Sequence, residues 1–286
     1  MSILINGLST GGVYAMIALG YTMVYGIAKM LNFAHGDVIM IGGYVIFFSM
    51  ATNSPLLAIA MAVVCCVILG IALEKVAYKP LRGASPLAVL ITAIGVSYLL
   101  QSLAQILFGS APKMVTVFEF GTAKVFGATV QISSLVTLAV TVAVMVALTT
   151  FVKCTRVGRA MIAVSEDRGA AQLMGINVNG IITLTFAIGS ALAALAGLFM
   201  LMKSSSVTNT MGAMPGIKAF TAAVIGGIGS IPGAMLGGIL LGMVESISYK
   251  FAAIAPYTDA IEFSILIIIL LVRPTGFLGK KRREKV

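Results

Sequence analysis

The stretch that decides the fold is AFTAAVIGGIGSIPGAMLGGILLGMV, residues 219–244, which contains no Asp, Glu, Lys or Arg. Its two apolar halves flank the segment GGIGSIPG, residues 226–233. Proline removes a backbone donor and glycine weakens a helix, so the stretch predicts two short helices that meet at a break. Non-helical backbone at membrane depth persists only against protein or a water-filled cavity. The break is therefore a candidate for part of a pathway through the membrane.

Charge-free runs of similar length fill the rest of the chain, at 1–28, 38–73, 83–112, 125–152 and 169–202. About 20 apolar residues cross the hydrocarbon core of a bilayer as a helix. With a turn at 53–55, the runs predict a broken, re-entrant helix pair at 217–249 and about seven clear transmembrane helices. These seven are 8–28, 36–52, 56–74, 86–108, 131–152, 181–202 and 257–273. The expected fold class is an all-α polytopic membrane protein, with residues 1–286 forming a single transmembrane domain.

Composition excludes the main soluble classes. The chain is 59% hydrophobic and only 10% charged, with a mean hydropathy of +1.08, whereas soluble domains carry about 25% charged residues. A cytosolic enzyme, a disordered chain and a secreted disulfide scaffold are therefore disfavoured. The net charge of +10 does not indicate a nucleic-acid partner, because the basic residues lie between the apolar runs. The three cysteines and one histidine form no ligand motif, so no metal or cofactor is expected.

The basic residues set the expected orientation. Fourteen of the 19 Lys and Arg residues lie in the segments 29–35, 74–85, 153–180 and 273–286. Since cytoplasmic loops carry an excess of Lys and Arg, we expect an outside N-terminus and a cytoplasmic C-terminus, with 276–286 as a basic cytoplasmic tail. The segment 109–130 is then an outside loop with a short strand pair. The five basic residues assigned to the outside are Lys113, Lys124, Lys203, Lys218 and Lys250.

A polar cluster separates the first two predicted spans. It contains Asn32, Asp37 and the only histidine, His35, and ionisable groups in a membrane commonly mark a pathway or a partner contact. In the alternative interpretation, Asp37 caps the second helix and His35 bonds a backbone carbonyl at the interface. Asp37 and Glu245 are isolated acids in the sequence, so we expect no row of carboxylates for coupling ions. The candidate pathway residues are Tyr21, Tyr25, Asn32, His35, Asp37, Gly229 and Ser230.

The loop 153–180 predicts short helices near 158–164 and over 166–174. Ser165 suits an N-cap and Gly175 suits the position after the last helical residue. An apolar edge, Leu173, Met174 and Ile176, follows the charged turn. It could contact a partner protein or the chain's own membrane domain, and the partner is favoured because apolar edges rimmed by charge are commonly interfaces. The residues expected to form this site are Arg159, Ser165, Glu166, Asp167, Gly175 and Asn177.

Several motifs resemble the permeases of bacterial branched-chain amino-acid ABC importers of the LivH type, in the same order and over nearly the whole chain. They are GVYAMIALGYTMVYG (12–26), NFAHGD (32–37), EKVAYKPLR (74–82), GRA (158–160), ED (166–167), MGIN (174–177), KAFTAAV (218–224) and GGIGSIPGA (226–234). Two departures are mild. Asp37 stands where Glu is common in the family, and Asp167-Arg168-Gly169 belongs to a variable part of the loop.

The resemblance implies a non-catalytic, multi-pass subunit of the bacterial inner membrane that moves branched-chain amino acids by alternating access. It implies two ABC ATPase subunits that bind the ATP, a second related permease subunit and an extracytoplasmic substrate-binding protein, all working in membrane lipid. The loop 153–180 then corresponds to the segment that couples the permease to the ATPase. A related permease for urea or short amides and a stand-alone secondary transporter are the alternatives.

Overall fold

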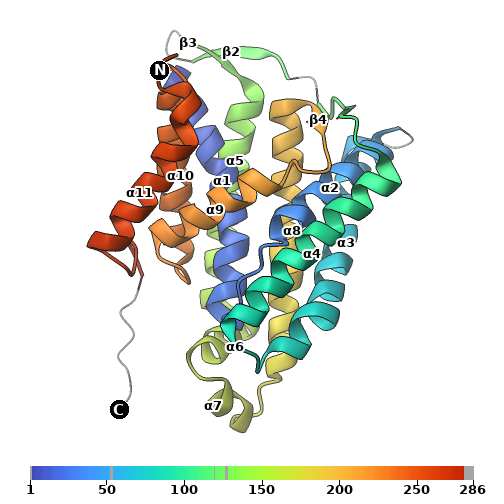
Figure 1. Cartoon of the computed structure of the whole chain (residues 1–286), viewed down its shortest axis with the longest axis vertical. Coiled ribbons are helices and arrows are strands. Elements are labelled where there is room, and N and C mark those ends of the chain that lie inside the picture. The colour runs from blue at the N-terminus through green and yellow to red at the C-terminus, as the bar shows by residue number, and fades with distance from the viewer. Residues whose placement is uncertain (1, 52–53, 119, 126–127, 280–286) are drawn as a thin grey trace.

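Helices make up most of the described residues, 2–51, 54–118, 120–125 and 128–279, of this computed structural model (Figure 1). The α-helices are α1 (Ser2–Ala28), α2 (His35–Met50), α3 (Pro55–Leu73), α4 (Pro86–Phe108), α5 (Ile132–Cys154), α6 (Arg156–Glu166), α7 (Arg168–Leu173), α8 (Val178–Ser204), α9 (Ala213–Gly226), α10 (Ile231–Ser248) and α11 (Thr258–Val272). The strands are β1 (Lys113–Met114), β2 (Thr122–Val125), β3 (Ala128–Gln131) and β4 (Ser206–Val207). Most of the predicted basic tail and part of the predicted turn at 53–55 lie outside the described residues.

Seven helices of the described chain are long and apolar enough to cross a membrane, namely α1, α3, α4, α5, α8, α10 and α11. The expected all-α polytopic class is therefore confirmed, whereas the assignment of the whole chain to one domain stays a prediction. The lengths differ from expectation in one respect. The break divides its stretch unequally, so that α10 has 18 residues and could span alone, whereas α9 has only 14. Elsewhere in the chain, α2 has 16 residues and is also shorter than the seven spanning helices.

Proline and hydroxyl residues begin several of these helices at the predicted places. Pro55 and Pro86 occupy first-turn positions, where the missing backbone donor costs nothing. The hydroxyl of Ser85 accepts a hydrogen bond from the Ala88 amide at 3.3 Å, and that of Thr155 accepts from the Gly158 amide at 2.9 Å. The third helix does not stop at its predicted end, because a π-helical turn, Glu74–Tyr78, extends it.

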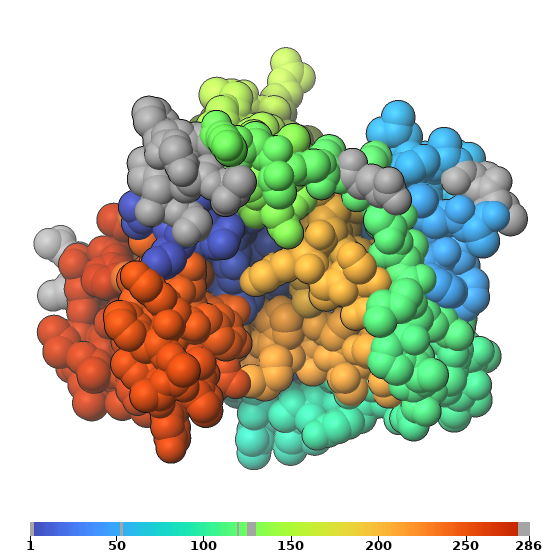
Figure 2. All heavy atoms as spheres, turned by 90° about the horizontal axis from the view of Figure 1, so that it is seen from above, coloured from blue at the N-terminus to red at the C-terminus, as the bar shows by residue number. Residues whose placement is uncertain are grey.

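The central helix of the bundle is α1, which packs against α5, α8, α9 and α10 (Figure 1). A second group, α2, α3 and α8, packs on its other side, with α4 against α2 and α11 against α9 and α10. Seen from the end that carries the N-terminus, a recess lies between the α10–α11 side and the segment that leads into α9, and atoms of α1 are visible at its base (Figure 2).

Small residues allow α1 and α10 to approach closely. A Cβ atom on Gly242 would lie 2.0 Å from the Gly11 backbone nitrogen, and one on Gly238 would lie 2.4 Å from that of Ala15. Such faces are typical of membrane helices, where backbone proximity replaces the hydrophobic driving force. The glycine spacing beyond the break therefore serves helix packing.

The two ends of the bundle carry different structures. At the N-terminal end, β2 and β3 form an antiparallel hairpin within the predicted outside loop, and β1 pairs with β4. At the opposite end, α6 and α7 project beyond the long helices (Figure 1). The strand pair expected within 109–130 is thus confirmed.

We expect Gly242→Ala to destabilise the protein by about 1–3 kcal/mol, because the added methyl group meets backbone atoms of α1 that no rotamer change can move. Gly95→Ala on α4 is the matched control, since a Cβ there meets nothing within 4 Å. Thermal unfolding in the same detergent measures both. Equal midpoints for the two variants would contradict the tight α1–α10 contact.

Candidate functional site

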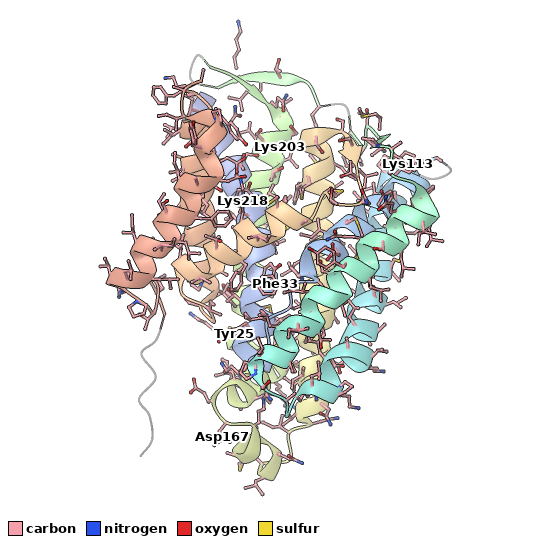
Figure 3. The ribbon with its side chains drawn as sticks, viewed as in Figure 1. Tyr25, Phe33, Lys113, Asp167, Lys203 and Lys218 are labelled. Carbon is pink, nitrogen blue, oxygen red and sulfur yellow. The ribbon has the colours of Figure 1, made fainter. Side chains whose placement is uncertain are left out.

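A small hollow brings together three of the predicted pathway residues. Tyr21 and Tyr25 of α1, and Asn32 from the segment after α1, line it together with Phe220 of α9 and Ile228 of the break. The Tyr21 ring stands edge-on to Phe220, with ring centroids 5.9 Å apart. Figure 3 shows Tyr25 and Phe33 below Lys218, toward the end that carries α6 and α7. The end of the first predicted span, the segment that follows it and the break therefore meet at one place.

His35 is packed into the bundle rather than facing this hollow. Its side chain is buried, its Nε2 atom has no hydrogen-bond partner among the described residues, and its ring lies 4.8 Å from that of Tyr21. A Cβ atom on Gly20 would lie 2.4 Å from Nε2. The position of the His35 ring therefore requires glycine at residue 20 of α1. This contact determines how closely the start of α2 packs against α1.

Asp37 and Asn32 bind partners from other helices. The Asp37 carboxylate is buried and accepts a hydrogen bond from Gln101 Nε2 of α4 at 2.9 Å. The residue at the N-cap of α2 is Ala34, which has no side-chain cap. The interpretation of Asp37 as a helix cap is therefore wrong, because its side chain pairs laterally. Asn32 Oδ1 accepts from the Tyr78 hydroxyl at 2.7 Å, which ties the segment after α1 to the π-helical turn.

The break between α9 and α10 is closed by the chain's own C-terminal segment. The amides of Phe277 and Leu278 donate to the carbonyls of Ile225 and Gly226, both at 2.9 Å. These carbonyls end α9 and would otherwise be unsatisfied. Gly227 has φ +101°, and a Cβ there would lie 2.3 Å from the Gly279 nitrogen. No motif in the sequence indicated this contact.

The two break residues named from the sequence have distinct structural roles. Ser230 is the N-cap of α10, and its hydroxyl accepts from the Gly233 amide at 3.2 Å. Gly229 has φ +95° and faces Gly26 of α1, where a Cβ on Gly26 would lie 3.3 Å from its Cα. The break therefore packs against α1 beside the hollow, as protein-lined backbone at membrane depth requires.

The loop between α5 and α8 differs from its prediction at the cap. Asp167, not Ser165, is the N-cap of α7 and accepts from the Ala170 amide at 3.0 Å. Ser165 is still helical in the last turn of α6, and its hydroxyl donates to the Ile162 carbonyl at 2.7 Å. Serine and aspartate both suit an N-cap. Because α6 continues through Glu166, residue 167 is the one that caps α7.

The position of Gly175 agrees with the prediction, whereas the roles proposed for Arg159 and Asn177 stay predictions. Gly175 follows α7 with φ +80°, the left-handed geometry typical of a helix end. Asn177 caps α8 by accepting from the Gly180 amide at 3.0 Å. Arg159 Nη1 donates to the Cys154 carbonyl at 3.2 Å. Leu173 and Met174 are 90% and 82% exposed.

Arg168 connects this loop to the bundle, which the sequence did not indicate. Its guanidinium donates to the Ala28 carbonyl at the end of α1. Burial and the nearby Arg82 charge lower the pKa of Arg168. Arg82 in turn pairs with Glu74 and with Asn179 of α8. A residue from a variable part of the loop therefore makes the direct link between α7 and α1.

Three charged residues from different helices, Lys218, Glu245 and Glu262, meet inside the bundle, and a fourth, the half-exposed Asp259, joins them from its surface. Lys218 Nζ of α9 lies 2.8 Å from Asp259, 3.2 Å from Glu262 and 3.7 Å from Glu245. The Tyr14 hydroxyl also donates to Glu245. The expectation that Glu245 is isolated is therefore wrong, and so is the placement of Lys218 in an outside loop. Lys218 is 5% exposed and belongs to a helix that packs against α1, α10 and α11.

A larger cleft, of about 510 Å³, opens at the N-terminal end of the bundle. Its walls come from α1, α8, α10 and the start of α5, and the segments around it are seen in Figure 2. Figure 3 shows Lys203 nearest this end, Lys218 deeper and Tyr25 deeper still. The residues that line the cleft are Ile3, Asn6, Ser9, Thr10, Val13, Gln131, Ser133, Ser134, Thr137, Phe199, Met202, Lys203, Glu245, Ser246, Tyr249 and Lys250.

We expect Lys218→Met to destabilise the protein by about 3 kcal/mol, because removing one partner leaves buried carboxylates uncompensated. Adding Glu262→Gln should recover part of that loss, since one buried negative charge is then removed. Lys124→Met on the exposed hairpin is the control and should change stability by less than about 0.5 kcal/mol. Thermal unfolding of the wild type, the two single variants, the double variant and the control measures the coupling, and simple additivity of the two substitutions would contradict it.

Comparison with known proteins identifies the family. Residues 3–270 match the model described as the branched-chain amino acid transport system permease component. The chain is 44% identical to BraD of Pseudomonas aeruginosa, a high-affinity branched-chain amino acid transport system permease protein, over 99% of this chain and 97% of that protein. It is 43% identical to LivH of Escherichia coli K12, which has the same description, over 98% and 96%.

A solved structure supports the fold independently. It is described as an inward-facing conformation of a metal-chelate type ABC transporter and has a TM-score of 0.52, with 15% identity over 94% of this chain and 87% of that one. At this identity the likeness concerns the fold alone. The match to the family model and the two relatives over almost their full length show that the chain belongs to the family of permease components of branched-chain amino acid transport systems.

Proposed function

We propose that the chain is the membrane-spanning, non-catalytic subunit of an ATP-driven importer of branched-chain amino acids. The observation that carries this proposal is the near full-length similarity to BraD and LivH. The geometry supports it, because a short helix with two exposed apolar side chains, Leu173 and Met174, projects from one end of the bundle. Exposed apolar groups in a charged loop are typical of a docking site.

The proposed assembly has four further subunits. Two ABC ATPases bind ATP and contact α6 and α7, and a second related permease completes the membrane unit. An extracytoplasmic binding protein delivers the amino acid to the end that carries the N-terminus. In this arrangement the chain lies in the bacterial inner membrane, with its N-terminus outside and its C-terminus in the cytoplasm, as the basic residues predict.

The contacts of Arg168 suggest how force reaches the membrane helices. When the ATPase moves α7, the guanidinium carries the motion to the Ala28 carbonyl at the end of α1. The segment that follows holds Asn32, which is bonded to Tyr78 and lines the hollow. A shift of α7 therefore changes the wall of the hollow directly, and ATP binding favours one of two arrangements of the bundle.

The two hollowed regions suit alternating access. The cleft is open at the N-terminal end, whereas the hollow beside Tyr21 and Tyr25 lies deeper in the bundle. Between them α1 is closely packed, with Met16, Ile17 and Leu19 fully buried. In this proposal the described arrangement corresponds to an outward-open state, and transport would require α1 and its neighbours to separate at the deeper level.

Reconstitution of the chain with its partner subunits in vesicles tests the proposal. We expect uptake of radiolabelled leucine, isoleucine and valine that needs ATP and the binding protein. Uptake of urea or short amides instead would assign a different substrate class. Leucine uptake by this chain alone, without ATP, would show a secondary transporter and overturn the proposal.

We expect Met174→Ser to weaken association with the ATPase about fivefold, which corresponds to about 1 kcal/mol. ATP-driven uptake should fall accordingly, because serine removes apolar contact from the docking edge. Met114→Ser is the matched control, since Met114 is 74% exposed at the other end of the molecule. Equal ATPase affinity for the two variants would contradict docking through α7.

A further inference from the structure

The outer cleft has two walls of opposite charge. Glu245 of α10 lines one side and belongs to the cluster around Lys218, in which the side chains of Glu245 and Glu262 are buried and that of Asp259 is 51% exposed. One ammonium group cannot balance three carboxylates, so full ionisation leaves an excess of negative charge. Glu245 is 7% exposed, and it is the member of this cluster that faces the cleft. This wall therefore favours a cationic group.

The other charged wall is basic. Lys203, in the last turn of α8, donates to the hydroxyl of Thr10 at 3.0 Å. Among the described residues it has no carboxylate within ion-pair distance, so its charge is available to an anion. Lys250, which follows α10, also lines the cleft, but it lies on the same side as Glu245. The wall formed by Lys203 therefore suits a carboxylate.

Apolar side chains lie between the charged walls. Val13 and Phe199 line the cleft and are 6% and 3% exposed, and Met202 lies beside them. Val13 and Phe199 belong to the hydrophobic core around α1, and Met202 packs against it. A ligand with an aliphatic side chain could therefore place that side chain against the base of the cleft.

We propose that this cleft binds an aliphatic amino acid as a zwitterion, with its carboxylate at Lys203, its ammonium group at Glu245 and its side chain against Val13, Phe199 and Met202. The inference rests on the proposed transport function and names where the substrate first binds the membrane subunit. A binding step here precedes the opening of the bundle at the level of Tyr21 and Tyr25.

Neighbouring turns of α1 hold the two charged groups. Lys203 donates to the hydroxyl of Thr10, and Glu245 accepts from the hydroxyl of Tyr14, which is four residues later on the same helix. An α-amino acid carries its ammonium and carboxylate groups on adjacent carbon atoms, so it offers one partner to each group, whereas a neutral amide lacks both charges.

Saturation-transfer NMR on the assembled transporter in nanodiscs, without the binding protein, tests the inference with three probes. The probes are leucine, 4-methylpentanoate, which lacks the ammonium group, and 3-methylbutylamine, which lacks the carboxylate. Signals from empty nanodiscs are subtracted. We expect leucine to give the strongest transfer, and each analogue to compete with it weakly.

Two nearly isosteric substitutions test the contribution of each charged wall to binding separately. Lys203→Gln should weaken the binding of leucine and of 4-methylpentanoate at least fivefold and leave the binding of 3-methylbutylamine unchanged. Glu245→Gln should weaken the binding of leucine and of 3-methylbutylamine. The binding of 4-methylpentanoate should not change, because glutamine still accepts the hydrogen bond from Tyr14 and so keeps the local structure. Lys124→Gln on the hairpin is the control and should change none of the probes. If either residue had only a structural role, its substitution would weaken the binding of all three probes to the same extent.

The outcomes separate this inference from the proposed function. A wild-type complex that imports leucine with ATP, but whose probe binding is the same in both variants, overturns the cleft site and leaves the function intact. A complex that imports no amino acid overturns the function itself. If the Glu245→Gln complex fails to assemble, Lys203→Gln alone decides the question, because the Lys203 side chain is exposed and its replacement should not disturb folding. The expected result is then weaker binding of 4-methylpentanoate and unchanged binding of 3-methylbutylamine.

Discussion

The structure depends on how closely α10 can approach α1. Their contact brings backbone against backbone at Gly11 and Gly242 and again at Ala15 and Gly238, so no side chain separates the two helices. Three of the features described above adjoin this pair. The cleft opens beside its upper part, the charged cluster joins it through Tyr14 and Glu245, and the break packs on α1 at Gly26. In lipid, where burial of apolar surface supplies little force between helices, this proximity is the main source of cohesion.

Much of the fold could be predicted from the sequence because membrane crossing requires long apolar runs and tolerates few charges. Pro55 and Pro86 begin helices, and Gly175 ends one with a positive φ, since each residue type acts through its own backbone. The break at 226–233 was predictable for the same reason. Ser165 and Asp167 show the limit, because both can cap a helix and only the length of α6 decides between them.

The long-range contacts were not predictable. Lys218, Glu245 and Glu262 come from three helices, and counting basic residues by loop treats each lysine as a marker of topology rather than as a partner. Arg168 lies where the family resemblance was weakest, yet it holds the end of α1. His35 and Asp37 attracted attention as polar groups in an apolar chain, and the structure gives them packing partners, Gly20 and Gln101, that lie on other helices.

The closure of the break has a consequence for how the chain is made. The carbonyls at the end of α9 receive their donors from Phe277 and Leu278, which leave the ribosome some fifty residues after them. Until residues 277 and 278 have been synthesised, the Ile225 and Gly226 carbonyls lack these donors. The break therefore reaches its described form only after the segment that follows α11 has folded back onto the end of α9.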